Sequence, residues 1–495
     1  MWNSINQALN MIDNFVWGVP LMVLIIAGGL LLTIRLGLLQ IRKLPLALKW
    51  MLQNEEGGKG EISSFSALCT ALSATIGTGN IVGVATAVCA GGPGALFWMV
   101  VAAFLGMATK YSEGLLAVKY RTVAEDGHSL GGPFYYIELG MGKKFKWLAK
   151  IFAFFGVCVG LFGIGTFSQV NGISSAVHGF FDPNDAFTVK ILPFLGEYSW
   201  SVVIASLILS FCVAAVLIGG VKRIASVSQI IVPFMAVIYF VFAVILICCN
   251  ITKVPAAFAT IVTAAFSPKA ITGGAVGSML IAMQKGVARG IFSNEAGLGS
   301  APIAAAAAQT NSPVRQGLVS MTGTFIDTII ICTLTGLSIV LTGAWQVEGL
   351  EGVQVTTYAF QHGLPFPAQF SSFILMLCLV FFAFTTILGW DYYSERCLEY
   401  LSGGNMKHVK IFRWIYILAV FIGPYMTVSA VWTIADIFNG LMAIPNMIAL
   451  FALSGVIVKE TRAFFQHAKE EALAEHRSFE EVCEENLNEE EAPAN

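Results

Sequence analysis

Long apolar stretches recur along almost the whole chain, and they limit its possible folds more than any other feature. Of the 495 residues, 56% are hydrophobic and 12% are charged. A helix needs about 20 mostly apolar residues to cross the hydrocarbon of a bilayer, whereas a membrane barrel shows strands of about ten residues with alternating polarity. The stretches are too long and too uniformly apolar for a barrel. The sequence therefore predicts an all-α integral membrane protein.

By this length criterion we expect about 11 transmembrane helices. They lie near residues 16–34, 63–90, 95–118, 148–177, 201–218, 224–249, 274–308, 318–341, 370–398, 409–425 and 428–458. Lys and Arg concentrate in cytoplasmic loops, and with the N-terminus outside, the predicted outer loops contain only Lys190, Lys253 and Lys269. We therefore expect a multi-pass protein with its N-terminus outside and its C-terminus in the cytoplasm.

Two of the expected spans are interrupted by glycine and polar residues. The first interruption covers residues 73–83 (SATIGTGNIVG), and the second covers residues 291–302 (IFSNEAGLGSAP). Each polar group at this depth needs a partner, so an interruption indicates a bound ligand or a moving part. Two glycine-rich packing helices are the alternative. Packing alone does not explain Asn80, Asn294 and Glu295 at the same depth.

Each interrupted span is the first of five consecutive spans, which predicts an internal repeat. Aligned on residues 76–80 and 291–295, the two halves have opposite orientations in the membrane because five is an odd number. Broken helices at matching places in two inverted halves indicate a secondary transporter with its site at the midplane. We expect four parts: an extra N-terminal helix with a basic cytoplasmic loop (1–62), a first repeat (63–250), a second, inverted repeat (272–458) and an acidic cytoplasmic tail (459–495).

A helix that breaks inside a membrane offers free N–H groups on one half and free carbonyls on the other, which suit an anionic group and a cation. A zwitterionic amino acid together with Na⁺ fits both. Gly77 and Gly79 would let the backbone approach the ligand closely, and Thr78 and Asn80 would supply side-chain hydrogen bonds. The alternative for Thr75 or Thr78 is a hydrogen bond to the carbonyl one turn back.

On four stretches the sequence resembles the alanine or glycine:cation symporters, prokaryotic carriers with the LeuT-type fold. The stretches are GTGNIVGVATA (77–87), GGPFYYIE (131–138), GIFSNEAGLGSAP (290–302) and LGWDYY (388–393). The resemblance implies a 5+5 inverted-repeat core preceded by one extra helix, in the prokaryotic plasma (inner) membrane. It also implies uptake of small neutral amino acids (alanine, glycine or serine) coupled to Na⁺ or protons, with no cofactor and no nucleic-acid partner.

Carried over by position, the resemblance assigns substrate binding to Thr78, Gly79, Asn80, Gln169, Ile291, Phe292 and Trp390. It assigns the cation to the carbonyls of Ser73 and Ile76 and the hydroxyls of Thr385 and Thr386, an oxygen-only set that suits a hard cation. Two alternatives stay open. Gln169 would otherwise form a helix–helix hydrogen bond, and Trp390 would otherwise be an interfacial or packing aromatic residue.

Several charged residues fall at membrane depth. Lys285 and Arg289 lie four residues apart on one helical face, so we expect them to pair with Glu295 or Asp327 and gate the inner exit. Ion pairs that only hold the bundle together are the alternative. If a carboxylate titrates during transport, we expect it to be Asp327, and protons would then drive the cycle. We favour Na⁺.

Two other classes of function are less favoured. An ion channel needs a filter with repeated rings of carbonyls or charges, and one chain with a single pair of breaks shows none. For a membrane-embedded enzyme, no His-Glu-x-x-His motif occurs, and the six histidines do not cluster within the expected spans. We therefore expect a symporter and not an enzyme.

Overall fold

A computed structural model describes residues 2–53, 55, 58–124, 127–190, 197–267, 278–425, 428–474 and 482. Within these residues the chain is almost entirely helical. The exceptions include two small antiparallel sheets, in which β1 (Thr122–Val123) pairs with β2 (Ser129–Leu130) and β3 (Thr188–Lys190) pairs with β4 (Glu197–Ser199). The helical architecture agrees with the sequence-based prediction.

The first half of the chain contains α1 (Trp2–Val16), α2 (Val19–Arg35), α3 (Leu39–Arg42), α4 (Leu44–Leu52), α5 (Ser64–Thr75), α6 (Val84–Gly91), α7 (Gly94–Lys119), α8 (Pro133–Tyr135), α9 (Lys146–Phe162), α10 (Phe167–Phe181), α11 (Trp200–Leu217) and α12 (Gly220–Cys249). The second half contains α13 (Val254–Phe266), α14 (Ser278–Asn294), α15 (Ala301–Ala305), α16 (Pro313–Thr324), α17 (Thr333–Thr342), α18 (Val353–Gly363), α19 (Ala368–Leu401), α20 (Met406–Ile422) and α21 (Val428–Ala474). Three π-helical segments are η1 (Gly79–Gly83), η2 (Tyr136–Gly140) and η5 (Phe325–Cys332), and short 3₁₀ turns are η3 (Lys143–Phe145), η4 (Ile251–Lys253), η6 (Ala344–Gln346) and η7 (Gly423–Tyr425).

Across the described ranges, 8 helical stretches are long and apolar enough to cross a membrane, or up to 9 if the bent pair α5 and α6 forms one span. These match nine of the expected spans. The other two expected spans correspond to α14 and α20, which have 17 residues each in the structure. The count of eleven therefore stays a prediction. The structure also contains two shorter helices, α13 and α18, in stretches expected to be loops.

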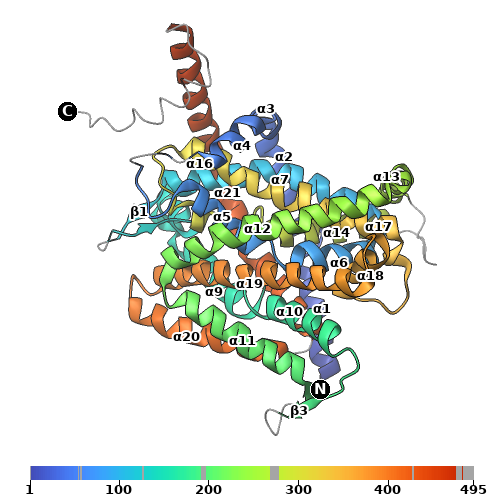
Figure 1. Cartoon of the computed structure of the whole chain (residues 1–495). Helices are drawn as coiled ribbons and strands as arrows, with labels where there is room; N and C mark the ends of the chain where they lie inside the picture. Colours follow the sequence, from blue (N-terminus) through green and yellow to red (C-terminus); the bar gives the residue numbers. More distant parts are fainter. Residues whose placement is uncertain are drawn as a thin grey trace.

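Two long helices flank the interrupted segments. α7 packs on α14, α15 and α16, while α19 packs on α5, α9, α10 and α12. Figure 1 shows α12 and α19 running side by side, and it shows the C-terminal part of α21 projecting away from the other helices. Interrupted segments from distant parts of the sequence are thereby enclosed in the interior.

The first interruption is confirmed and is narrower than expected. α5 continues through Ser73 to Thr75, and η1 begins at Gly79, so residues 76–78 form the break, across which the two helical parts are bent by 51°. Both Ser73 and Thr75 remain helical, and their hydroxyls donate to carbonyls one turn back in α5. For Thr75 the alternative role considered from the sequence is therefore the correct one.

The second interruption is also confirmed, but it begins later than the alignment placed it. α14 continues through Ile291 and Asn294, and the chain is non-helical from residue 295 to residue 300. Glu295 has φ 57°, in the left-handed region that non-glycine residues rarely adopt. The structurally equivalent breaks are thus residues 76–78 and 295–300, and the alignment on residues 76–80 and 291–295 is wrong by about one helical turn.

The start of the expected second repeat and most of the expected acidic tail lie outside the residues that the structure describes. They comprise residues 272–277 and most of the residues beyond 474. Between them, α14/α15, α16/α17, α19, α20 and α21 correspond in order to the expected spans of the second half.

Candidate functional site

The free backbone N–H groups of the first break are bonded by side chains. Gly77 N donates to Asn80 Oδ1 at 2.9 Å, and Thr78 N donates to Gln169 Oε1 at 3.0 Å. The Gln169 amide nitrogen in turn donates to the carbonyl of Ile164, at the turn before α10. Gln169 therefore makes the interhelical hydrogen bond that was the alternative to a substrate contact, and this bond holds it directly against the break.

The Asn80 amide also connects the first break to a buried carboxylate. Asn80 Nδ2 donates to Asp327 Oδ1 at 2.7 Å, and Asp327 lies in the π-helical segment η5. The other carboxylate oxygen, Oδ2, accepts from Ser293 at 2.9 Å and from Thr328 at 2.6 Å. Ser293 lies at the end of α14, just before the second break, so residues at both breaks donate to one carboxylate.

The hydroxyl of Thr78 is fully buried and has no hydrogen-bond partner among the described residues. Its methyl group faces Gly172 of α10. Gly172 has no side chain, and a Cβ atom added there would lie only 2.4 Å from Thr78 Cγ2. A buried hydroxyl without a partner is costly in a folded protein. Thr78 is therefore the residue of the first break with spare hydrogen-bonding capacity.

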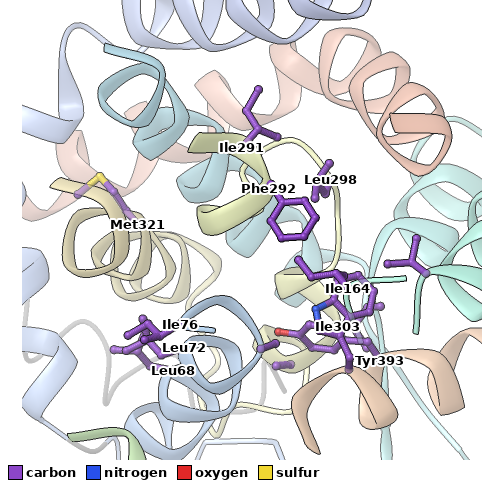
Figure 2. Packing of buried hydrophobic residues seen from close by; sticks show 14 of the residues in the cluster. Leu68, Leu72, Ile76, Ile164, Ile291, Phe292, Leu298, Ile303, Met321 and Tyr393 are labelled. Atoms are coloured by element: carbon purple, nitrogen blue, oxygen red, sulfur yellow. The ribbon is translucent and has the colours of Figure 1, made fainter. Parts of the chain in front are cut away.

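The two breaks also meet through an apolar contact. A Cβ at Gly79 would lie 3.2 Å from the Cα of Ser293 and 3.4 Å from a ring carbon of Phe292, so a larger residue would crowd α14. Phe292 is buried, and its ring centroid lies 5.3 Å from that of Trp432 in α21. Figure 2 shows Ile291 and Phe292 together near the end of α14. The predicted substrate residues Gly79 and Phe292 are thus neighbours.

The loop of the second break is held by polar contacts from α7 and α19. Trp390 Nε1 donates to Glu295 Oε1 at 2.8 Å, and Ser300 donates to the other oxygen of that carboxylate. Gly297 N donates to Glu113 Oε1 at 3.1 Å. The structure thus assigns Trp390 a hydrogen bond to the second break, a role that neither sequence-based reading of this residue included.

The residues expected to ligate the cation are only partly brought together. Thr386 Oγ1 donates to the carbonyl of Ile76 at 3.3 Å, which links α19 to the first break. Thr385 is buried, and its hydroxyl bonds to carbonyls of its own helix. Ser73 lies about one turn before Ile76, where α5 packs on α19. A Cβ atom added at Gly389 of α19 would lie 2.9 Å from Ser73 Oγ. The Ile76 carbonyl and the Thr386 hydroxyl are the two members in direct contact.

Lys285 and Arg289 form the charged face of α14, and the ion pair expected for Arg289 differs from the one in the structure. Its guanidinium pairs with the Asp436 carboxylate through two hydrogen bonds of 2.9 and 2.7 Å, and not with Glu295 or Asp327. Lys285, one turn earlier, also acts electrostatically on Asp436. Both expected acidic partners lie beyond the end of the charged face and are already bonded by neutral donors.

A cavity of about 1110 Å³ reaches one side of the breaks. Its lining includes Thr86 and Cys89 of α6, Gly172 of α10, and Arg289 with Trp432. It also includes the segment before α18, which belongs to a predicted outer loop. In the predicted topology the pair of Arg289 and Asp436 therefore lies on the outer side and not at the expected inner exit.

A small cavity of about 10 Å³ lies on the opposite side, between α5, α7, α15 and α16. Along the first broken segment, the small cavity comes before the break and the large cavity after it. Along the second segment the order is reversed, because Arg289 lines the large cavity and Ala301 lines the small one. The two broken segments therefore run in opposite directions past the breaks.

Several partners of these contacts were not identified as site residues from the sequence, namely Ser293, Thr328, Ser300, Glu113, Asp436, Trp432 and Asn446. Asn446 donates to Glu113 at 2.7 Å and to the carbonyl of Gly297 at 2.9 Å, and so ties α21 to the second break. The sequence feature that could have identified such residues is a polar or charged side chain inside an apolar stretch. Asp436 and Asn446 have that feature, while Trp432 does not differ from a packing aromatic.

Membrane helices that break in pairs and meet at a buried polar site define the class of secondary transporters. Comparison with known proteins agrees: residues 2–478 match the sodium:alanine symporter family. The chain is 46% identical to the sodium/alanine symporter AgcS of Methanococcus maripaludis, covering 94% of this chain and 98% of that protein. It is 55% identical to an uncharacterized transporter of Haemophilus influenzae (94% and 97% covered) and 35% identical to the amino-acid carrier protein AlsT of Bacillus subtilis (95% and 94% covered).

The chain belongs to the sodium:alanine symporter family. It is thus a multi-pass membrane protein and a cation-coupled amino-acid symporter, and the family implies Na⁺ as the coupling ion. The resemblance stated from the four sequence stretches is confirmed. Those stretches come together in space, since Gly79 faces Phe292, Trp390 bonds to Glu295, and a Cβ at Gly299 would lie 2.7 Å from Pro133.

Proposed function

We propose that the protein couples the uptake of small neutral amino acids, alanine and glycine first and then serine, to the entry of Na⁺. The observation that carries this proposal is the meeting of two oppositely directed helix breaks at one buried carboxylate, Asp327. Broken helices arranged in this way place N–H groups and carbonyls at the same depth. The carboxylate of an amino acid suits the N–H groups, whereas its ammonium group and Na⁺ suit the carbonyl oxygens.

Within this site, Thr78, Gly79 and Asn80 form the substrate half. Thr78 contributes the unpartnered buried hydroxyl, and Gly79 packs closely against Ser293 and Phe292 of α14. Gln169 of α10, Ile291 and Phe292 of α14, and Trp390 of α19 complete the proposed substrate site. The proposed preference for alanine and glycine over large amino acids follows from the close approach of the two breaks.

The cation half consists of the carbonyls of Ser73 and Ile76 and the hydroxyls of Thr385 and Thr386. The contact between Thr386 and the Ile76 carbonyl supports this assignment, because Na⁺ replaces such a hydrogen bond by ligation from both oxygens. Each Na⁺ that enters gains about 2.3 kcal/mol per 100 mV of membrane potential. That energy concentrates a neutral solute appreciably.

Transport would proceed by alternating access in a LeuT-type core. We propose two inverted repeats of five spans, residues 63–250 and 272–458, with one extra helix within residues 1–62 and a cytoplasmic tail at 459–495. The presence of a large cavity on one side of the breaks and a nearly closed cavity on the other supports this scheme. The proposed location is the prokaryotic inner membrane, with the N-terminus and the large cavity outside. In this scheme Arg289, Lys285 and Asp436 gate the outer entrance.

The experiment is uptake of radiolabelled alanine by proteoliposomes that contain the purified full chain. An inward Na⁺ gradient should drive accumulation above equilibrium, while an equal K⁺ gradient should not. Gradient-independent equilibration of alanine, or no uptake of any small neutral amino acid, would overturn the proposal.

Proton coupling at Asp327 is a second candidate. The observation that favours it is a fully buried carboxylate bonded to residues at both breaks, which is where a proton would affect both segments. Alanine accumulation driven by a pH gradient without Na⁺ would support protons over Na⁺. No accumulation under that condition would exclude this second candidate.

A further inference from the structure

The small cavity has an unusual lining for an enclosed space between membrane helices. Most of its wall is apolar or small, and its polar lining consists of Thr75, Lys110, Gln316 and Ser320. Lys110 of α7 is the only charged residue among those that line it. A volume of about 10 Å³ holds at most about one water molecule. The cavity is therefore closed to an amino acid in this conformation.

The position of the cavity places it on the path that leads away from the breaks. Thr75 is the last helical residue before the first break, and Ala301 is the first helical residue after the second break. Both residues line the cavity, and so do Leu72 and Leu68, one and two turns earlier in α5. Figure 2 labels both leucines in the same apolar cluster as Ile76. Separation of α5 from α15 would enlarge this cavity directly next to the two breaks.

Two polar groups in the cavity wall lack hydrogen bonds within the described part of the chain. The Lys110 ammonium has no partner and the side chain is 2% exposed, and the Gln316 amide oxygen likewise has none at 1% exposed. A buried ammonium in a membrane is costly unless it meets an acceptor. This wall therefore offers an ammonium donor to a ligand with acceptor oxygens.

Buried carboxylates lie near Lys110 but do not occupy its hydrogen-bonding positions. Lys110 acts electrostatically on Glu113, Glu295 and Asp327. Both oxygens of Glu295 and of Asp327 accept hydrogen bonds from neutral donors, whereas Glu113 Oε2 accepts none among the described residues. The Lys110 ammonium forms no hydrogen bond with any of these carboxylates, and Lys110 lines the cavity.

We propose that Lys110 forms a second, transient binding station for the α-carboxylate of the transported amino acid on the path opposite the large cavity. When α5 and α15 separate, the ammonium group binds the carboxylate of the departing substrate. Gln316, Thr75 and Ser320 supply further polar contacts, while Leu68 and Leu72 face the substrate's small side chain. The inference rests on the proposed function, because it requires an amino acid at the breaks.

A purely structural role for Lys110 makes a different prediction. Lys110 and Glu113 are three residues apart on one face of α7, so the lysine alternatively serves only to neutralise that glutamate. In that case the double variant Lys110→Met with Glu113→Gln restores transport, because it removes both charges. A carboxylate station predicts that the double variant stays defective.

The test compares binding with translocation for the full chain in the presence of Na⁺. Alanine binding to the purified Lys110→Met variant should stay within about twofold of the unmodified protein, while alanine exchange and net uptake in proteoliposomes should fall about tenfold or more, the value of one charge-assisted hydrogen bond. Lys119→Met is the matched control, since Lys119 lies on the same helix and pairs with Glu460 near the surface. It should transport normally.

Three outcomes would overturn the station: normal transport by Lys110→Met, parallel loss of binding and transport, or restored transport in the double variant. If Lys110→Met does not fold, Gln316→Met on the opposite wall provides the test. It should show the same separation of binding from exchange, and normal exchange in it would overturn the proposal. Failure of the unmodified protein to take up any small neutral amino acid would instead overturn the proposed function together with the station.

Discussion

Asn80 donates from its amide nitrogen to the carboxylate of Asp327 at 2.7 Å, and its amide oxygen accepts from Gly77 N at 2.9 Å. One side chain thus holds the first break in shape and connects it to η5. Because Ser293 donates to the same carboxylate at 2.9 Å, a change at one break reaches the other through two hydrogen bonds. We propose this shared carboxylate as the structural basis for coupling the amino acid to Na⁺.

Replacing Asn80 by alanine should weaken alanine binding more than Na⁺ binding. The substitution removes the acceptor for Gly77 N and a donor to Asp327, which we expect to reduce alanine affinity about tenfold or more. Titrations of the purified protein with alanine and with Na⁺ measure both effects. Asn405→Ala, at the start of α20 away from the breaks, is the control. Equal loss of both affinities would contradict the division into a substrate half and a cation half.

Thr386→Val should act in the opposite way. The substitution keeps the shape of the side chain and removes the hydroxyl that contacts the Ile76 carbonyl. We expect the Na⁺ concentration that half-saturates alanine uptake to rise about tenfold, the effect of losing one ligand or hydrogen bond. Thr342→Val in α17, where the hydroxyl bonds only to its own helix, is the matched control. Unchanged Na⁺ dependence in Thr386→Val would remove this residue from the cation half.

Trp390→Phe should destabilise the fold through the second break. The indole N–H donates to the buried Glu295 carboxylate, and hydrogen bonds to charged groups contribute about 1.5–3 kcal/mol. Trp414→Phe, at a 63% exposed position in α20, controls for loss of the indole itself. Thermal unfolding of the purified variants measures the difference. The account requires a lower melting temperature for Trp390→Phe than for Trp414→Phe, and equal values would argue against the bond.

Cys89 provides a natural test of orientation because it lines the large cavity. A membrane-impermeant maleimide should label it from the extracellular side, and saturating alanine with Na⁺ should slow the reaction. The other exposed cysteines in the described ranges, Cys212, Cys248 and Cys249, lie on α11 and α12 and do not line this cavity. Cys89→Ser gives the background signal. Labelling only from the cytoplasmic side would reverse the proposed topology.

The presence of both breaks was predictable because glycine and amide residues interrupt strongly apolar stretches. Their limits were not predictable, because a serine or threonine satisfies its hydroxyl inside a membrane helix just as well as outside it. Ser73 therefore remains helical although it begins the polar run. For the second break, the helix continues to Asn294 because the change to left-handed backbone occurs at Glu295, a position where residue type alone gives no signal.

The sequence also did not predict which distant residues pair with one another. Several carboxylates occur at similar depth, and the sequence offers no way to decide which one Arg289 meets. The fold selects Asp436, and it uses Asp327 and Glu295 as acceptors for neutral donors. Side-chain spacing on one helix predicts which residues share a face, whereas the packed bundle determines which face lies opposite.

The most direct test of the central claim is the mutual dependence of alanine and Na⁺ binding in the purified full chain. If the two breaks form one coupled site, Na⁺ raises the affinity for alanine, and alanine raises the affinity for Na⁺ by the same factor. Asn80→Ala should reduce that factor. An alanine affinity that is independent of Na⁺ would contradict the account.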